Sequence, residues 1–143
     1  MIIPFKKIHP LAKLPKRANQ ADAGADLYSV EDTQLEAFSW KAVPTGLVGA
    51  IPHGYVGLIH PRSGLALKKG LTVLNAPGTV DSGYRGEFLI ILYNASKQKI
   101  FLEAGTRIAQ LIIQEIQLAD FQWRDQLDET DRSDGGFGST GHK

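Results

Sequence analysis

The stretch that decides the fold is VDSGYRGEFLIILYN, which runs from Val80 to Asn94. It closes one apolar run, passes through a polar segment that contains glycine, and enters a second apolar run at Phe88. Gly83 permits the positive φ that a tight turn requires. The stretch therefore predicts a β-hairpin, in which Val80 and Asp81 end one strand and Phe88 restarts a buried one.

Short apolar runs of this kind, separated by glycine and proline, fill most of the chain. They span residues 47–51, 55–60, 71–74, 88–93 and 108–113. Many short strands with turn residues between them predict an all-β fold, a distorted jelly-roll barrel or sandwich. The fold has room for at most one short helix, SGLALKKG, with Ser63 as its N-cap and Gly70 as its stop.

The composition limits the classes of function. A chain of 143 residues with 43% hydrophobic and 22% charged residues suits one soluble domain. A net charge of +1 offers no general attraction to nucleic acid or to a membrane surface, so neither partner is expected. There are no cysteines, and the four histidines follow no zinc-binding spacing, so no zinc site is expected.

The N-terminal segment MIIPFKKIHPLAKLPKR is interrupted by lysine and proline, and it lacks the apolar core of a signal peptide. No later run approaches the length of about 18 apolar residues that a membrane helix needs. The sequence therefore predicts a cytoplasmic protein. A nuclear or organellar location stays open for a eukaryotic source.

The C-terminal segment DRSDGGFGSTGHK, residues 131–143, has one large apolar side chain, Phe137, among glycines and small polar residues. Glycine loses the most backbone freedom on ordering, and little here could be buried. The sequence predicts a β-barrel domain over residues 1–130 and a flexible tail over residues 131–143.

Two polar clusters precede or follow apolar runs in the first half of the chain. In ADAGADLYS, Asp22 and Asp26 flank Gly24 and could bind a hard cation, or simply cap their own turn. In PRSG, Arg62 and Ser63 stand where the short helix begins, an arrangement that suits a phosphate. The alternative is a solvated arginine beside an N-cap serine.

Two further clusters lie in the second half. In NAPGTVDSGYRGEF, Asn75 offers a donor and an acceptor, Asp81 could act as a general base, and Tyr84 offers an apolar face. The alternative is a plain turn capped by an aspartate. In RIAQL, Arg107 and Gln110 could equally point outward from a half-buried strand.

The order of the clusters is more specific than any one of them. The series AGADLYS, PRSGLALKKG, GTVDSGYRGE, RIAQLI and RSDGGFGSTG resembles the five ordered motifs of the trimeric deoxyuridine triphosphatases, or dUTPases. The resemblance runs from Ala21 to Gly141, and its third and fifth motifs are highly specific. It implies a jelly-roll homotrimer with active sites shared between subunits. It also implies hydrolysis of dUTP to dUMP and pyrophosphate with Mg²⁺, which limits uracil incorporation into DNA and supplies dUMP for thymidylate synthesis.

The resemblance assigns roles in the third motif and just before it. Asp81 matches the carboxylate that activates the attacking water, and Tyr84 matches the residue that packs on the sugar and excludes a 2′-hydroxyl. Asn75 matches a uracil contact. The remaining pocket residues are Thr79, Val80 and Leu89.

The other motifs supply the phosphate side. The matching phosphate contacts are Arg62, Ser63, Gly64 and Gln110. Asp26 matches a carboxylate near the metal, which it reaches through water, while the substrate phosphates mainly hold the Mg²⁺.

In the tail, Phe137 matches the residue that stacks on uracil when the tail closes over the nucleotide. Arg132 with Ser139 and Thr140 matches the γ-phosphate contacts, and Gly138 is among the glycines that let the backbone approach phosphate. One departure is Ser133, where the family usually has glycine; a positive φ at this residue would strain it.

Three other interpretations compete with this one. A dCTP deaminase shares the fold, but Ile91 occupies the position of its catalytic glutamate, Glu87 lies four residues too early, and Tyr84 stands where that family has tryptophan. A non-catalytic dUTP-binding module would not need Asp81 or the tail. A structural jelly-roll trimer does not explain five motifs in order.

Overall fold

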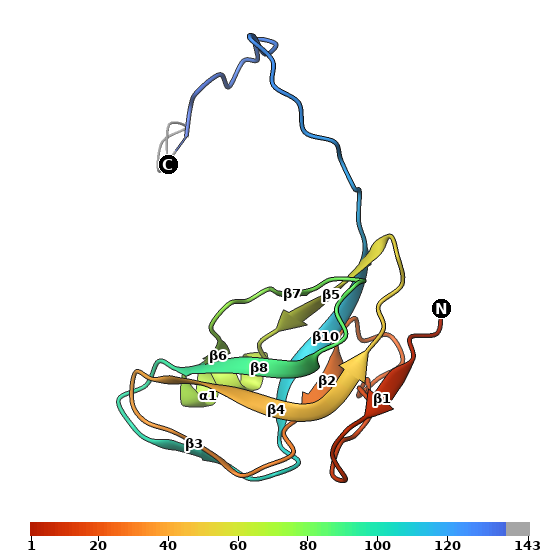
Figure 1. The fold of residues 1–143 in the computed structure, drawn as a ribbon. Helices are drawn as coiled ribbons and strands as arrows, with labels where there is room; N and C mark the ends of the chain where they lie inside the picture. The colour runs from red at the N-terminus through yellow and green to blue at the C-terminus, as the bar shows by residue number, and fades with distance from the viewer. Residues whose placement is uncertain (137–143) are drawn as a thin grey trace.

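The computed structural model describes residues 1–136 of the chain (Figure 1). Within them, ten β-strands and one short helix form, so the prediction of an all-β fold with one short helix is confirmed. The elements are β1 Phe5–Lys7, β2 Ala25–Tyr28, β3 Thr33–Leu35, β4 Trp40–Gly49, β5 Tyr55–His60, α1 Ser63–Lys69, β6 Leu71–Val73, β7 Gly78–Val80, β8 Glu87–Asn94, β9 Ile100–Leu102 and β10 Arg107–Glu115. No helix in this part of the chain has the length and apolar character needed to cross a membrane.

The strands form two four-stranded sheets and one two-stranded sheet, all antiparallel. The orders are β1-β4-β8-β6, β2-β10-β5-β7 and β3-β9. One continuous core joins all three sheets. Its fully buried members include Leu27 of β2, Val43 of β4 and Leu92 of β8. Burial of these apolar side chains is the main force that holds the sheets together.

Strand β8 shows the alternation that makes it the centre of the first sheet. Phe88, Ile90, Leu92 and Asn94 are buried, whereas Leu89 between them is exposed. A period of two places every second side chain on one face of a sheet. Leu89 therefore projects from the opposite face, the side on which a surface cavity can form.

The predicted hairpin between β7 and β8 is wrong. Strand β7 pairs with β5 in the second sheet, while β8 pairs with β4 and β6 in the first. Because neighbours occupy both edges of β8, it has no free edge to offer β7. Residues 81–86 therefore form an arch that passes from one sheet to the other. Gly83 lacks the expected positive φ; among the described glycines, those with positive φ are Gly46, Gly54, Gly70 and Gly105.

Helix α1 ends as predicted and begins differently. Gly70 is the C-cap, with φ of 65° in the left-handed region, and its amide donates to the Ala66 carbonyl. The N-cap is Arg62 and not Ser63, and its side chain makes no capping hydrogen bond. This leaves the hydroxyl of Ser63 and the first helical amides available at the surface.

An irregularity in β4 brings it close to the arch. The pairing of β4 with β8 shifts between Pro44 and Val48. Inside this shift, the Thr45 hydroxyl donates to the Phe88 carbonyl at 2.7 Å, and the Gly46 amide donates to Oε1 of Glu87 at 2.7 Å. These bonds tie the beginning of β8, and with it the end of the arch, to β4.

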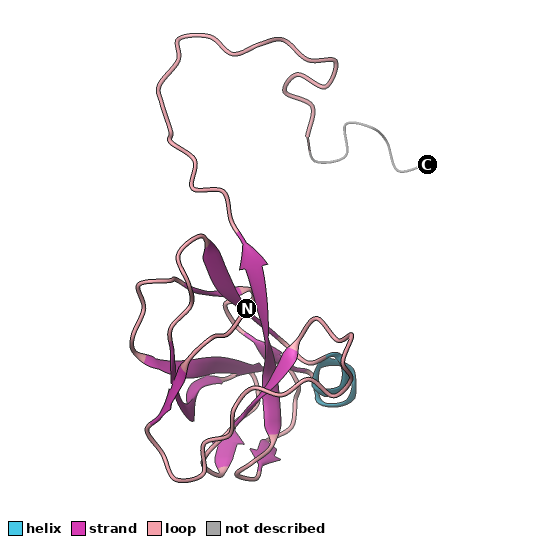
Figure 2. Cartoon of the chain, turned by 90° about the vertical axis from the view of Figure 1, so that its right-hand side faces the viewer, coloured by secondary structure: helices cyan, strands magenta, loops and turns pink. Residues whose placement is uncertain are grey.

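After β10, residues 116–136 form neither helix nor strand, and the chain runs away from the sheets (Figures 1 and 2). Within this arm, Phe121 is 96% exposed and Trp123 is fully exposed. Ser133 has a φ of 44°, the positive value that strains a serine where the dUTPase motif usually has glycine. Residues 137–143 lie outside the described part of the chain.

Candidate active site

The arch closes over a cavity of about 320 Å³, here named the arch cavity. Its size suits a small-molecule ligand. All of the residues predicted around the third motif line it: Asn75, Thr79, Val80, Asp81, Tyr84 and Leu89. Apolar neighbours, among them Ile59 and Ile91, complete the wall. The structure therefore brings together a carboxylate, an amide side chain and an aromatic ring in one mainly apolar hollow.

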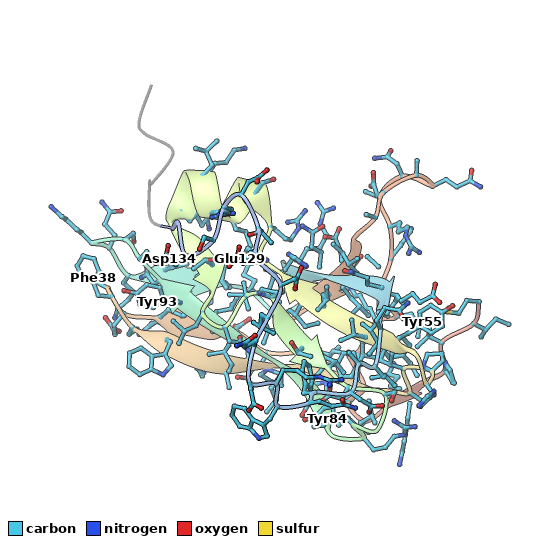
Figure 3. All side chains as sticks on the ribbon, turned by 90° about the horizontal axis from the view of Figure 1, so that it is seen from above. Phe38, Tyr55, Tyr84, Tyr93, Glu129 and Asp134 are labelled. Carbon is cyan, nitrogen blue, oxygen red and sulfur yellow. The ribbon has the colours of Figure 1, made fainter. Side chains whose placement is uncertain are left out.

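The Tyr84 ring is held in place by its own chain (Figure 3). Its hydroxyl donates to the Glu87 carbonyl at 3.0 Å, and its ring centroid lies 6.5 Å from that of Phe88. A Cβ atom at Gly86 would collide with the ring, so this fold-back requires glycine there. With its hydroxyl occupied, Tyr84 offers the cavity a fixed apolar surface.

Asn75 is placed by a similar close approach. A Cβ atom at Gly78 would lie 3.2 Å from Nδ2 of Asn75, so glycine lets the amide side chain rest against β7. An amide presents donors and an acceptor in one plane. Asn75 can therefore read the edge of a flat polar ring in the arch cavity.

A second, more polar cavity of about 440 Å³ lies at the start of α1, and we name it the helix-end cavity. It gathers the residues predicted from the first, second and fourth motifs: Asp26, Arg62, Ser63, Gly64 and Gln110. Gln110 faces this cavity, and its Nε2 donates to the Pro61 carbonyl at 3.0 Å. Gly24 makes room for it, since a Cβ there would collide with the Gln110 side chain.

Asp26 holds two arginines. Its Oδ1 lies 2.9 Å from Nε of Arg62, and its Oδ2 lies 3.1 Å from Nη1 of Arg107. The Asp26 side chain is 12% exposed and that of Arg62 is 27% exposed, so this pair is partly shielded from water. The ion pair fixes the Arg62 guanidinium at the mouth of the cavity. Sequence reasoning gave Arg107 no role in the site; its place in RIAQL, beside Gln110, was the available signal.

Asp22 behaves as the simpler alternative predicted. Its Oδ2 accepts the Asn19 amide at 2.8 Å, so the carboxylate caps a local turn. Among the described residues, no group of three acidic or histidine side chains could hold a metal ion. The carboxylate nearest the predicted metal position, Asp26, already has both oxygens engaged. This donor set fits an Mg²⁺ ion that takes most of its ligands from phosphates and water.

The two cavities share no lining residue. Asp81 and Tyr84 belong to the arch cavity, whereas Arg62 and Gln110 belong to the helix-end cavity. Arg132 lies in the arm, where its Nε donates to the Gly135 carbonyl at 2.9 Å. The other predicted tail contacts, Phe137, Gly138, Ser139 and Thr140, lie outside the described residues. One chain thus carries the predicted site in separate parts.

An apolar hollow with ring-reading groups and a polar hollow with a fixed arginine define a nucleotide-binding β-sheet enzyme as the class of protein. A family model described as dUTPase matches residues 11–141. The chain therefore belongs to the dUTPase family.

Relatives from actinobacteria are similar over most of their length. The chain is 51% identical to the deoxyuridine 5′-triphosphate nucleotidohydrolase of Nocardia farcinica, over 97% of this chain and 85% of that protein. It is 50% identical to the enzyme of the same name from Corynebacterium glutamicum, over 90% and 87%. It is 48% identical to that from Mycobacterium leprae, over 94% and 92%.

Solved structures share the fold. The dUTPase of Staphylococcus bacteriophage 80alpha, as its G164S mutant with dUpNHpp, superposes with a TM-score of 0.92 and 27% identity over 99% of both chains. This likeness and the closer bacterial relatives agree on the family.

Proposed function

We propose that this protein hydrolyses dUTP to dUMP and pyrophosphate. The observation that carries the proposal is the arch cavity, in which Asn75, Asp81 and Tyr84 meet. Relatives that are about half identical to this chain bear the name of that activity. The test is product analysis with Mg²⁺ and, separately, dUTP, dCTP, dTTP and UTP. Release of pyrophosphate and dUMP from dUTP alone is the expected result.

Asp81 is the general base of this mechanism. It follows directly on Val80, the last residue of β7, so a firmly paired strand positions its carboxylate. The carboxylate accepts a proton from a water molecule, whose oxygen forms a new bond to phosphorus. The phosphorus–oxygen bond to pyrophosphate breaks, and the leaving group carries away the electron pair.

Base and sugar are selected in the arch cavity. Asn75 and the backbone of residues 79–81 offer donors and acceptors that match uracil, and a cytosine would leave some of these groups unpaired. Tyr84 packs on the sugar face and leaves no space for a 2′-hydroxyl.

The helix-end cavity holds the phosphates. Arg62 can grip phosphate oxygens, Ser63 and the amide of Gly64 can donate to them, and Gln110 closes the side. Bound Mg²⁺ neutralises the triphosphate charge, and Asp26 contacts its water shell. A phage φ11 dUTPase structure that shares the fold has been described with a structural Mg(II) ion, a statement about that protein alone.

The separation of the two cavities supports a homotrimer with shared active sites. A nucleotide spans base to γ-phosphate, so one subunit supplies the arch cavity and a neighbour supplies the helix-end cavity. In this assembly residues 1–130 form the barrel domain, and residues 131–143 form a lid. Arg132, Phe137, Gly138, Ser139 and Thr140 would contact uracil and the γ-phosphate when the lid closes.

A further inference from the structure

We propose that Glu87 is a positioning residue that sets the sugar selectivity of the arch cavity through Tyr84. The inference rests on the proposed function, because it assigns the selectivity of that same site. Glu87 stands between the arch and β8, and it is bonded on both sides. Its side chain accepts a hydrogen bond from β4, and its backbone accepts one from the arch.

The first bond fixes the Glu87 side chain to β4. Oε1 of Glu87 accepts the amide of Gly46 at 2.7 Å in a partly buried position. Gly46 has a φ of 67°, and a Cβ there would lie 2.6 Å from Cβ of His9 and 2.9 Å from Cβ of Ala12. The donor therefore belongs to a rigid, tightly packed part of the fold, and an ionised acceptor gives one of the stronger hydrogen bonds.

The second bond passes this rigidity to Tyr84. The Glu87 backbone carbonyl accepts the Tyr84 hydroxyl at 3.0 Å. The Tyr84 ring therefore takes its position from residue 87, which takes its own position from β4. Residues 81–86 contain no regular pairing of their own, so this route is the firmest that the described structure offers between Tyr84 and the sheet.

Loss of the carboxylate would leave the Gly46 amide without its acceptor and free the arch to move. Sub-ångström shifts of a group that excludes a 2′-hydroxyl are enough to change discrimination. The chemistry at Asp81 would suffer less, because β7 positions Asp81 independently. The expected signature is therefore a loss of selectivity larger than the loss of turnover.

The experiment compares the wild type with Glu87→Ala, Glu87→Gln and the control Glu115→Ala, whose side chain is exposed at the end of β10. For each, kcat and KM are measured with dUTP and UTP, along with amide hydrogen exchange at Gly46 and thermal stability. In Glu87→Ala we expect the dUTP/UTP ratio of kcat/KM to fall about tenfold, with faster exchange at Gly46. Glu87→Gln keeps an oxygen acceptor and should return the ratio to within about threefold. Glu115→Ala should match the wild type.

Two results would overturn the inference alone: an unchanged dUTP/UTP ratio in Glu87→Ala, or an equal loss on both nucleotides that follows a loss of folded protein. A Glu87→Gln variant as unselective as Glu87→Ala would also overturn it, since the acceptor would then not be the cause. A wild type that turns over no dUTP would instead remove the proposed function itself, and the inference with it.

Discussion

Asp26 and Arg62 form an ion pair whose closest atoms, Oδ1 and Nε, lie 2.9 Å apart. The pair joins β2 to the residue that precedes α1. Because Arg107 occupies the other oxygen of Asp26, the carboxylate acts as a shared anchor for two cations. It determines where Arg62 stands in the helix-end cavity before any phosphate arrives.

Replacing Asp26 by asparagine should disturb this anchor. Both arginines lose their counter-charge, and we expect kcat/KM for dUTP to fall about 100-fold because Arg62 is no longer held. Unfolding free energy should fall by about 1–2 kcal/mol, since the pair is only partly buried. Steady-state kinetics and urea unfolding check this, with Asp22→Asn as the control. Wild-type kinetics in Asp26→Asn would show that Arg62 needs no anchor.

Asp81→Asn should abolish turnover while nucleotide binding is largely kept. The amide has a similar shape but cannot take the proton from water, so the loss should be at least about 100-fold in kcat. Isothermal titration with a non-hydrolysable dUTP analogue measures binding separately from turnover. Asp120→Asn, in the arm, serves as the control. Unchanged kcat would remove Asp81 from the role of base.

Two alternative glycine substitutions separate conformation from crowding. At Gly46, alanine meets both a positive φ and the Cβ atoms of His9 and Ala12, and we expect a loss of about 2–4 kcal/mol in unfolding free energy. Gly54 has a φ of 82°, and an added Cβ atom would meet nothing within 4 Å, so the expected loss is about 1 kcal/mol. Denaturant unfolding measures both. Equal losses would mean that crowding at Gly46 relaxes away.

Deletion of residues 131–143 should leave a folded trimer with severely reduced hydrolysis. The described strands end at Glu115, so the deletion removes no described strand and no described core residue. Circular dichroism and light scattering check the fold and the trimer. Phe137→Ala should abolish the protection of the tail from protease that nucleotide confers. An unfolded truncated protein would identify the tail as structural, and persistent protection would count against stacking by Phe137.

A mixing experiment tests the shared site directly. Asp81→Asn and Arg62→Gln should each be nearly inactive alone. Co-expressed subunits should regain about a quarter of wild-type activity, because random assembly pairs an intact arch cavity with an intact helix-end cavity at that frequency. Light scattering should report a trimer. Activity that stays at the sum of the two variants would place the whole site within one chain.

Local sequence signals predicted the parts of the fold that depend on near neighbours. The run 55–60 coincides with β5, and Gly70 ends α1, because alternation and a left-handed stop act over a few residues. The hairpin at residues 80–94 failed for a non-local reason: β4 and β6 pair with both edges of β8. No pattern within that stretch carries this information.

The candidate site shows the same division. Motif order identified Asp81, Tyr84, Arg62 and Gln110, and the structure gathers them into two cavities. It could not reveal that Arg107 shares Asp26 with Arg62, because the pair joins β2 and β10 across the fold. Nor could it reveal the bond from Glu87 to Gly46, which depends on a register shift within β4.

The arm also gives the protein an optical reporter. The sequence has two tryptophans. Trp123 lies fully exposed in the arm, and Trp40 lies in β4 with 65% of its surface exposed. In a Trp40→Phe background, emission would come from the arm alone. A blue shift of that emission on assembly or on nucleotide addition would then time the arrival of the arm on its neighbour, with no added dye.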